Sequence, residues 1–320
     1  MDKDKQLSEI IEGIKAKEIT IEWMRNLESL STPDKKHIEE ELKAYYTDVL
    51  NKDEVKELFH VDELDKEQKE IFTWGTDQAD EKFSPIQKSS FILFAGEAGS
   101  GKTEFLFDLA MKNATAGIKT LFISLEMESE AVYTRKSMRY AGITKKQWQD
   151  KRRVGEHQRN AYFRKKKELK GIEKLSIIGF DTDQETTLET ILGEIEKRQP
   201  SLAIVDNFNL VARERNINDL EQDDFVSRGF MDFTNKKDIP VIVVHHVNKS
   251  KEIRGSQKII DHADSVMVCK RHDPKDVGAT DRQKSEFNVV EVKDRQFGLG
   301  GFVTYIFNKG TFIQNDEIIS

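Results

Sequence analysis

The stretch Gly96–Thr103, GEAGSGKT, has residue types and spacing suited to binding nucleotide phosphates. It matches the P-loop pattern at every fixed position, with an apolar run before it and a helical pattern after it. Glycines let backbone N–H groups turn toward phosphate oxygens, while Lys102 can reach the phosphates and the Thr103 hydroxyl can bind Mg²⁺. The predicted nucleotide-binding residues of this motif are Gly96, Glu97, Ala98, Gly99, Ser100, Gly101, Lys102 and Thr103.

Two carboxylates elsewhere in the chain could complete such a site. Asp206 ends the apolar run LAIVD, and ligands bind at the carboxyl ends of strands in open parallel sheets. Asp206 could therefore share a Mg²⁺ ion with Thr103, although a strand-end aspartate can also cap a turn. Glu126, in SLEM, follows another apolar run. A carboxylate there could orient a water molecule for hydrolysis or cap a helix.

Two adjacent histidines, His245 and His246, close the valine-rich run VIVVHH. Neighbouring residues of a strand point to opposite faces, so the two should not act together on one ligand. Cys269 is the only cysteine, which excludes disulfides within the chain and cysteine-rich zinc sites. We therefore expect His245 to be a packing residue or a support for the tautomer of its neighbour, rather than a metal ligand.

Strands that alternate with helices must position these residues. The expected strands are 91–95, 120–125, 175–179, 202–206 and 240–246. One expected helix follows the glycine turn and ends at about 116, and others cover 144–171, 186–198 and 219–236. This alternation predicts an α/β fold with a mainly parallel sheet and helices on both faces. Later apolar runs have little helix between them, so we expect antiparallel strands at one sheet edge, at 265–269, 287–293, 302–307 and 311–313.

The first 74 residues differ from the rest, with 12 Lys and Arg against 20 Asp and Glu. Helical spacing of apolar residues predicts a small all-helical module over 1–50 and a linker helix over 51–74. The main domain then covers 75–320. Because the module is acidic, we expect it to dock a protein or to pack in an assembly rather than to contact DNA.

The chain of 320 residues has a formal net charge of −7, but the charge is uneven. Residues 135–174 hold 15 Lys and Arg against 4 Asp and Glu. Such a cluster could contact phosphates or form a solvated helical face. The sequence contains no apolar run of about 18 residues, and MDKDKQ lacks an apolar signal core. We therefore expect no membrane span and a cytoplasmic location.

Six motifs follow one another along the chain, namely GEAGSGKT, ISLEM, AIVDN, VVHHVNKS, IRGSQKIIDHADSVMVCKR and EVKDRQFGLGG. In order and spacing they resemble the motor domain of the DnaB-type hexameric replicative helicases, and they are also similar to the phage helicase-primase and Twinkle branch. The resemblance covers about residues 75–313. It implies a RecA-like fold, ATP and Mg²⁺ in the site, and a homo-oligomer, expected to be a hexamer.

The resemblance also implies roles for residues near the nucleotide. Glu126 falls at the position of the family's catalytic glutamate. Asp206 falls at that of the Mg²⁺-shell aspartate, and His246 at that of the residue that senses the γ-phosphate. Arg271 and Phe307 fall where the family flanks the nucleotide base. An arginine and an aromatic ring suit that task, although Phe307 could equally belong to the core.

Two basic residues late in the chain carry a further implication. Arg295 in KDRQFG falls at the family's arginine finger, which completes the site of a neighbouring subunit, and Lys293 falls at its basic companion. Residues i and i+2 of a strand share a face, so the two could address one phosphate group together. Such a shared site would make hydrolysis depend on assembly.

Two loops after central strands would face DNA in such a ring. Arg213 and Arg215 lie in the first, and Lys249 and Lys251 in the second. All four could contact phosphates or be ordinary loop charges. The stretch 249–253 in the second loop is shorter than the family pattern. This leaves open a RecA-, RadA- or KaiC-like ATPase that assembles on DNA or on a partner without unwinding.

The resemblance thus implies an ATP-dependent DNA helicase that translocates on single-stranded DNA and unwinds duplex during replication. A loader or a primase would dock on the N-terminal module. A P-loop kinase with residues 151–170 as its lid fits less well, because such a kinase has no place for the C-terminal strands and the late arginine finger.

Overall fold

The computed structural model describes residues 72–180, 186–212, 218–247, 257–271, 278–295 and 300–314. They belong to one compact unit, Glu70–Ser320. The predicted module over 1–50 and all but the last three residues of the predicted linker helix lie outside the described residues. The same holds for the four loop residues expected to contact DNA, Arg213, Arg215, Lys249 and Lys251.

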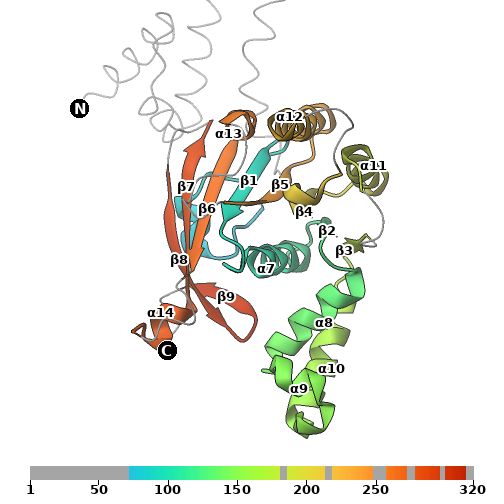
Figure 1. Ribbon diagram of the computed structural model, residues 1–320, viewed down its shortest axis with the longest axis vertical. Coiled ribbons are helices and arrows are strands. Elements are labelled where there is room, and N and C mark those ends of the chain that lie inside the picture. The colour runs from blue at the N-terminus through green and yellow to red at the C-terminus, as the bar shows by residue number, and fades with distance from the viewer. Residues whose placement is uncertain are drawn as a thin grey trace, which may run out of the picture. The chain divides into compact units, whose positions relative to one another are not determined.

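A nine-stranded mixed sheet lies at the centre of the described part of the chain (Figure 1). Its strand order is β3-β2-β4-β5-β1-β6-β7-β8-β9. The strands from β3 through β6 in this order are parallel, and β7, β8 and β9 are antiparallel. Their bounds are β1 Phe91–Gly96, β2 Thr120–Ser124, β3 Leu175–Gly179, β4 Leu202–Asp206, β5 Val241–His246, β6 Ser265–Arg271, β7 Glu286–Asp294, β8 Phe302–Asn308 and β9 Thr311–Gln314.

The prediction of a mainly parallel sheet with antiparallel C-terminal strands is confirmed, with one correction. We expected 265–269 to be the first antiparallel strand, but β6 pairs with β1 in parallel, from Ile92 opposite Ser265 to Gly96 opposite Cys269. The connection from β5 to β6 includes α13 (Gln257–His262), which brings the chain back to the end of the sheet where β1 begins. The change of direction therefore comes one strand later, at β7.

Helices cover both faces of the sheet, as predicted (Figure 1). On one face α7 (Lys102–Thr115) packs Phe105 and Leu106 against strand residues such as Phe94 and Phe122. The other face carries α11 (Leu188–Arg198), α12 (Asp219–Lys237) and α13. Alternate residues of a strand face opposite sides, so Leu93, Leu121 and Ile123, which lie next to Phe94 and Phe122 in the chain, belong to the second core.

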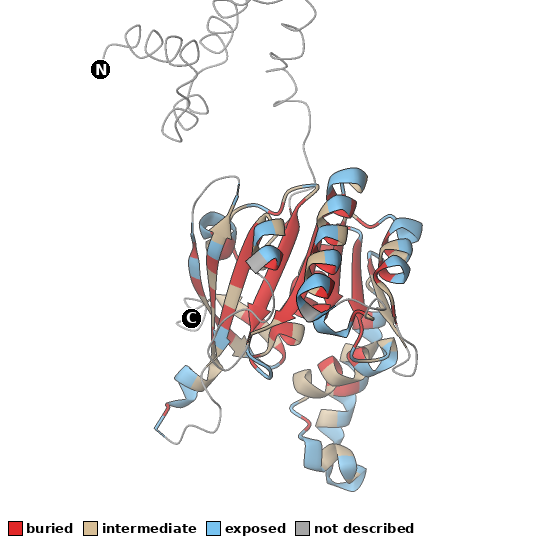
Figure 2. Ribbon diagram, turned by 45° about the horizontal axis from the view of Figure 1, so that its top comes forward, coloured by how far each residue is buried: buried red, intermediate tan, exposed pale blue. Residues whose placement is uncertain are grey.

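Because both faces are covered, the inner strands are apolar and buried along almost their whole length (Figure 2). β3 lies at the sheet edge and is only partly buried beyond its first residue. The antiparallel strand β7 alternates between buried and partly exposed positions up to Glu291. Burial therefore follows the position of each strand in the sheet.

A helical arm projects from the sheet between β2 and β3 (Figure 1). It consists of α8 (Ser129–Tyr140), α9 (Lys145–Gln149), the short 3₁₀ helix η1 (Lys151–Arg153) and α10 (Glu156–Lys170). The arm contains the basic cluster of residues 135–174, and several of its basic side chains already have carboxylate partners. These partners include Glu130, Asp150 and Glu168. Much of the cluster is therefore a salt-bridged helical surface.

Three short helices complete the described secondary structure. They are α6 (Asp77–Lys82), η2 (Phe208–Leu210) and α14 (Asp281–Ser285). Among the residues that the structure describes, none of the helices combines the length and the apolar character needed to cross a bilayer.

Candidate nucleotide-binding site

The P-loop joins β1 to α7 and leaves the amino end of α7 open. Gly99 and Gly101 have φ values of +78° and +106°, a region that other residues rarely adopt. Gly101 precedes α7, and no side chain caps the helix there. The N–H groups of its first turn are therefore available to an anion, and the helix dipole favours negative charge at this end.

The base of the loop packs directly on β6. A β-carbon at Gly96 would come within 2.5 Å of the Cys269 Sγ atom, so only glycine fits there. The thiol is buried and lies 3.5 Å from the Ser100 Oγ atom. Burial raises the pKa of Cys269 to about 11, so the thiol stays protonated at neutral pH. Sequence reasoning did not single out this support beneath the loop.

Lys102 is folded back over the loop. Its Nζ atom donates to the Gly96 carbonyl at 2.7 Å and to the Glu97 carbonyl at 2.8 Å, and lies 3.2 Å from His246 Nδ1. Only 4% of the residue is exposed, and burial lowers the pKa of Lys102. These weak neutral acceptors could be exchanged for the charged oxygens of a phosphate, which bind an ammonium group more strongly.

Asp206 lies at the carboxyl end of β4, next to the P-loop. It is 1% exposed, and neither carboxylate oxygen has a hydrogen-bond partner among the described residues. Burial raises the pKa of Asp206 to about 6, against the opposing effects of the Thr103 hydroxyl and of Lys102. A buried carboxylate whose oxygens have no hydrogen-bond partner, with the Thr103 hydroxyl nearby, is suited to a divalent cation.

The surroundings of Asp206 favour Mg²⁺ in particular. Within the part of the chain that the structure describes, no group of three His, Cys, Asp or Glu residues could enclose a metal ion. Asp206 and Thr103 would offer a cation two protein oxygens as ligands. Mg²⁺ is commonly bound in this way, through one or two protein oxygens.

Glu126 and His246 meet at the carboxyl ends of β2 and β5, and Asn207 joins them. The Asn207 Nδ2 atom donates to Glu126 Oε1 and lies 3.1 Å from His246 Nε2. Glu126 Oε1 and His246 Nε2 are 3.7 Å apart. The contact with His246 contributes most to lowering the pKa of Glu126, and burial acts against it. Glu126, which was predicted from SLEM, therefore lies within this cluster as an ionised carboxylate.

Sequence reasoning missed Asn207, although it directly follows the predicted metal ligand in AIVDN. Only 2% of the residue is exposed, and the peptide bond between Asp206 and Asn207 is cis. The available signal was its position at a strand end, where polar side chains collect in parallel sheets. Its partners became visible only once β2, β4 and β5 were placed side by side.

The two histidines point in opposite directions, as predicted. His245 is fully buried, and its ring lies 5.1 Å from the Phe208 ring, between centroids. His246 is partly exposed and faces Lys102, Glu126 and Asn207. The expectation that the two side chains point to opposite faces of β5 is confirmed, and the surroundings of His245 agree with a packing role.

The structure also brings together Arg271 and Phe307, which were predicted to flank the base. The Arg271 guanidinium carbon lies 5.2 Å from the Phe307 ring centroid, and its Nε donates to the Lys284 carbonyl at 3.2 Å. A second guanidinium, that of Arg139 in the arm, lies 5.9 Å from the same ring. Because Arg271 and Phe307 contact each other, a base could enter between them only if they separated.

Lys293 and Arg295 lie at the opposite end of the sheet from the P-loop. Their side chains reach the carboxyl end of α13, where Lys293 Nζ donates to the Ala263 carbonyl at 2.7 Å. Arg295 pairs with Asp264 at 3.2 Å and also donates to the Asp261 carbonyl. The expectation that the two share a face is confirmed.

The position of Arg295 excludes it from the P-loop of its own chain. Asp264, its partner, also accepts from the Phe91 backbone N–H, where β1 begins, whereas the P-loop follows Gly96, where β1 ends. Six strand residues span roughly 16 Å at about 3.3 Å each. Among the predicted site residues that are described, Lys293 and Arg295 are therefore the two that the fold does not bring to the site.

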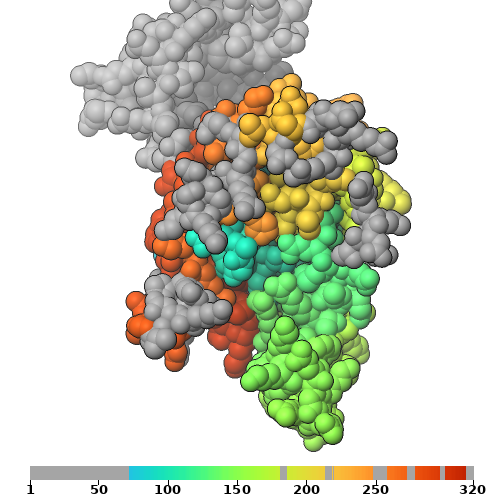
Figure 3. Space-filling view, in the orientation of Figure 1, coloured from blue at the N-terminus to red at the C-terminus, as the bar shows by residue number. Residues whose placement is uncertain are grey.

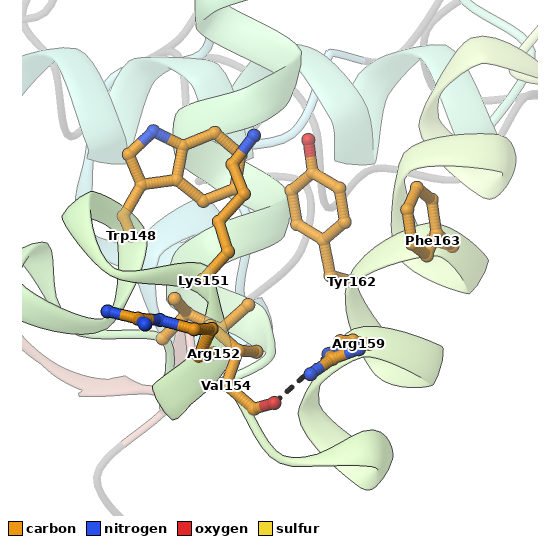
Figure 4. A pocket seen from close by; sticks show the side chains of 8 residues that line it. Trp148, Lys151, Arg152, Val154, Arg159, Tyr162 and Phe163 are labelled. Atoms are coloured by element: carbon orange, nitrogen blue, oxygen red, sulfur yellow. Dashed lines mark hydrogen bonds between the residues drawn. The ribbon is translucent and has the colours of Figure 1, made fainter.

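The arm contains a cavity of about 560 Å³ that is separate from the P-loop. In the space-filling view the arm forms a distinct lobe (Figure 3). Trp148 and Tyr162 line the cavity with their rings, and Lys151, Arg152 and Arg159 bring basic groups to it (Figure 4). None of the residues that line it belongs to the cluster around Lys102.

A P-loop at the end of a parallel strand, with acidic groups at the ends of neighbouring strands, defines a P-loop nucleotide-binding protein with a RecA-like sheet. Residues 72–313 match the family described as the DnaB-like helicase C-terminal domain. The chain belongs to this family. The match extends over all the described motifs and agrees with the resemblance noted in the sequence.

Solved structures agree on the fold. One of them, described as an ATPase domain, is 18% identical, with a TM-score of 0.69, and the likeness covers 81% of this chain and 97% of that one. A DnaB-like replicative helicase, solved in work that also concerns its interactions with primase, is 17% identical, with a TM-score of 0.68. Here the likeness covers 83% of this chain and 66% of the other.

A curated relative matches part of the chain. The DNA repair protein RadA of Aquifex aeolicus (strain VF5) is 26% identical over 212 residues, which is 65% of this chain. The chain matches only 40% of the length of that relative.

Proposed function

We propose that this protein is the ATP-driven motor of a ring-shaped DNA helicase that moves along single-stranded DNA and separates duplex DNA during replication. The observation that carries the proposal is the division of the site between two ends of the sheet. Lys102, Asp206, Glu126 and His246 meet at one end, whereas Arg295 lies at the other. Head-to-tail contact between copies would bring Arg295 to a neighbour's nucleotide.

In this proposal the P-loop residues hold ATP. The open N–H groups of α7 and the Lys102 ammonium bind phosphate oxygens, and Lys102 leaves the Gly96 and Glu97 carbonyls to do so. Thr103 and Asp206 would hold Mg²⁺, which supplies positive charge to the phosphates when bound. Binding would remove the cost of the buried, unpartnered Asp206 carboxylate.

Glu126 acts on the attacking water. Its lowered pKa keeps it ionised, so it can accept a proton while the water oxygen bonds to the γ-phosphorus and the bond to the bridging oxygen breaks. His246 lies between Lys102 and Asn207, where it can sense whether a γ-phosphate is present. Arg271 and Phe307 separate to hold the base between them.

Arg295 and Lys293 act on the neighbouring subunit. In the single chain both are engaged by carbonyls at the end of α13, so they must leave these acceptors to reach a neighbour's phosphate. A guanidinium that reaches a γ-phosphate stabilises the charge of the transition state, and such fingers contribute about 10³–10⁵-fold in other NTPases. An isolated subunit should therefore hydrolyse ATP slowly.

DNA would contact the loops that follow β4 and β5. Both strands end at the same end of the sheet as β1, where the P-loop lies. We assign phosphate contacts to Arg213 and Arg215 in the first loop and to Lys249 and Lys251 in the second. Such contacts bind a strand without reading its sequence. A hexamer would close the ring, and the acidic module over 1–50 would dock a loader or a primase.

A forked DNA substrate tests the proposal. ATP-dependent strand displacement by the wild type, lost in Lys102→Ala and in Arg295→Ala, is the expected result. Mixed rings of the two variants should recover hydrolysis, because each variant supplies the half-site that the other lacks. DNA-stimulated hydrolysis by intact rings without strand displacement would instead identify an ATPase that assembles on DNA without unwinding it.

A further inference from the structure

Asn207 lies between two residues to which the proposed function gives separate tasks. It is 2% exposed, and its Nδ2 group lies against both Glu126 Oε1 and His246 Nε2. The same turn also holds the main chain of His246, because Asn209 Oδ1 accepts from the His246 backbone N–H at 3.2 Å. Glu126, on the chain segment after β2, and His246, on β5, are thus joined through the turn after β4.

The orientation of the Asn207 amide follows from its charged neighbour. Glu126 is an acceptor, so the amide group that faces it must be the NH₂ group. Reversing the amide would place the Asn207 carbonyl oxygen against a carboxylate, with no proton between two acceptors. The second hydrogen of the same NH₂ group then points to His246 Nε2.

Lys102 and Asn207 compete for the single acceptor nitrogen of a neutral His246 ring. A neutral imidazole carries one N–H and one acceptor nitrogen. The Lys102 ammonium lies 3.2 Å from Nδ1, and the Asn207 NH₂ group lies 3.1 Å from Nε2. Both neighbours are donors, and the ring can accept from only one of them. One of the two contacts must therefore be left unmade while Lys102 stays in this position.

We propose that Asn207 is a positioning residue that holds Glu126 and sets the tautomer of His246 according to the position of Lys102. When Lys102 donates to Nδ1, the proton of the ring is on Nε2, where it faces Asn207 and also the Glu126 carboxylate, whose Oε1 atom is 3.7 Å away. When Lys102 moves to a phosphate, Nε2 accepts from Asn207 and the proton moves to Nδ1. His246 then presents an N–H donor where Lys102 was, and the bond from Asn207 to the Glu126–His246 pair is complete.

The consequence concerns the timing of catalysis, and it rests on the proposed function. The amide bridge is fully satisfied only when the nucleotide has drawn Lys102 away. With a phosphate present to be attacked, Glu126 and His246 would therefore each accept one hydrogen of the same Asn207 NH₂ group, in place of the direct contact between Nε2–H and Glu126. An asparagine that only stabilised the turn would have no effect on the histidine ring.

The direct test reads the tautomer of His246 by ¹⁵N NMR of histidine-labelled protein, with the His246→Gln variant to identify its signals. We expect Nε2–H in the free wild type and Nδ1–H with a non-hydrolysable ATP analogue and Mg²⁺. In Lys102→Ala we expect Nδ1–H without any nucleotide, because the competing donor is gone. This last arm does not depend on ATP binding, so it separates failure of the inference from failure of the proposed function.

Two substitutions at Asn207 complete the test. Asn207→Asp replaces the NH₂ donor by an acceptor, so His246 should keep Nε2–H with and without the analogue. Asn207→Ala removes the bridge, and kcat should fall about 10- to 100-fold with little change in KM, a part of the 10²–10⁴ that a positioned general base contributes. Asn209→Ala is the matched control from the same turn, and it should leave the tautomers as in the wild type.

Several results would overturn the inference. An Nε2–H tautomer that persists in Lys102→Ala would show that Asn207 does not set the proton. Wild-type tautomers in Asn207→Asp would lead to the same conclusion. Equal losses of kcat in Asn207→Ala and Asn209→Ala, together with equal losses of thermal stability, would reduce Asn207 to a structural residue of the turn.

Discussion

Lys136 in the arm offers a quantitative test of how α8 is held to the P-loop helix. Its Nζ atom lies 3.2 Å from Glu104 Oε1 and 3.2 Å from Asp108 Oδ1, both on α7. The side chain is 3% exposed, and the two carboxylates are 4% and 2% exposed. Lys136→Met would keep most of the apolar volume and remove the charge, leaving two buried carboxylates facing a thioether.

The size of the effect follows from the remaining partners. Breaking a buried ion pair by removing one member costs about 3–5 kcal/mol, because a charge is left uncompensated. Glu104 would still have Arg139 at 3.0 Å, and Asp108 would still have Lys112 at 3.4 Å and the Phe312 backbone N–H at 3.0 Å. These partners place the expected loss near the lower end, about 3 kcal/mol.

The measurement is urea unfolding of the full chain, followed by tryptophan fluorescence and circular dichroism. Lys166→Met is the matched control, since Lys166 also lies in the arm and pairs with Glu130 at 2.6 Å, but the Glu130 side chain is 56% exposed. Water can replace that partner, so the control should shift the midpoint far less. Equal shifts in the two variants would refute the reasoning that burial, rather than pairing as such, sets the cost.

Three further predictions concern other parts of the described structure. In Gly179→Ala the new β-carbon would meet backbone atoms of Ser129 and, at 2.5 Å, of Glu128, so the free energy of unfolding, measured in urea, should fall. In the control Gly193→Ala, inside α11, the new β-carbon meets no atom within 4 Å, and the free energy of unfolding should rise by about 0.5–1 kcal/mol. Burial raises the pKa of Glu291, so the stability of the wild type relative to Glu291→Gln should be greatest below pH 4.5 and should fall as pH rises through the raised pKa; a difference that is constant with pH would contradict this. With its pKa raised to about 11, the buried Cys269 thiol should react with a thiol reagent at pH 8 far more slowly in native than in urea-unfolded protein, and equal rates would show that the loop above it opens freely.

The sequence predicted well those features that depend on local pattern. The P-loop and the strands around it could be located because they form a short, recognisable pattern. Asp206 and Glu126 could be located because they follow apolar strands, at the carboxyl ends where ligands bind. The opposite orientations of His245 and His246 followed from the two-residue period of a strand. The antiparallel C-terminal strands also followed from pattern, although the direction of β6 did not.

The sequence did not predict features that depend on neighbours far apart in the chain. Asn207 contacts Glu126, 81 residues earlier, and His246, 39 residues later, so no spacing rule could identify it. Lys136 looked like one charge in a basic cluster, yet it is buried against two carboxylates of α7. Its role depends on where the arm folds back, which the helical pattern of the arm does not specify.

The sequence by itself thus determined the chemistry available to this protein, because phosphate binding requires a fixed run of residues in one loop. Only the tertiary structure decided which groups share that chemistry. Parallel order brings Glu126, Asn207 and His246 to the P-loop end of the sheet, and the antiparallel strand β7 leaves Arg295 at the other end. The physical reason is that a parallel strand delivers its carboxyl end to the site, whereas β7 runs in the opposite direction and carries its last residues away from it.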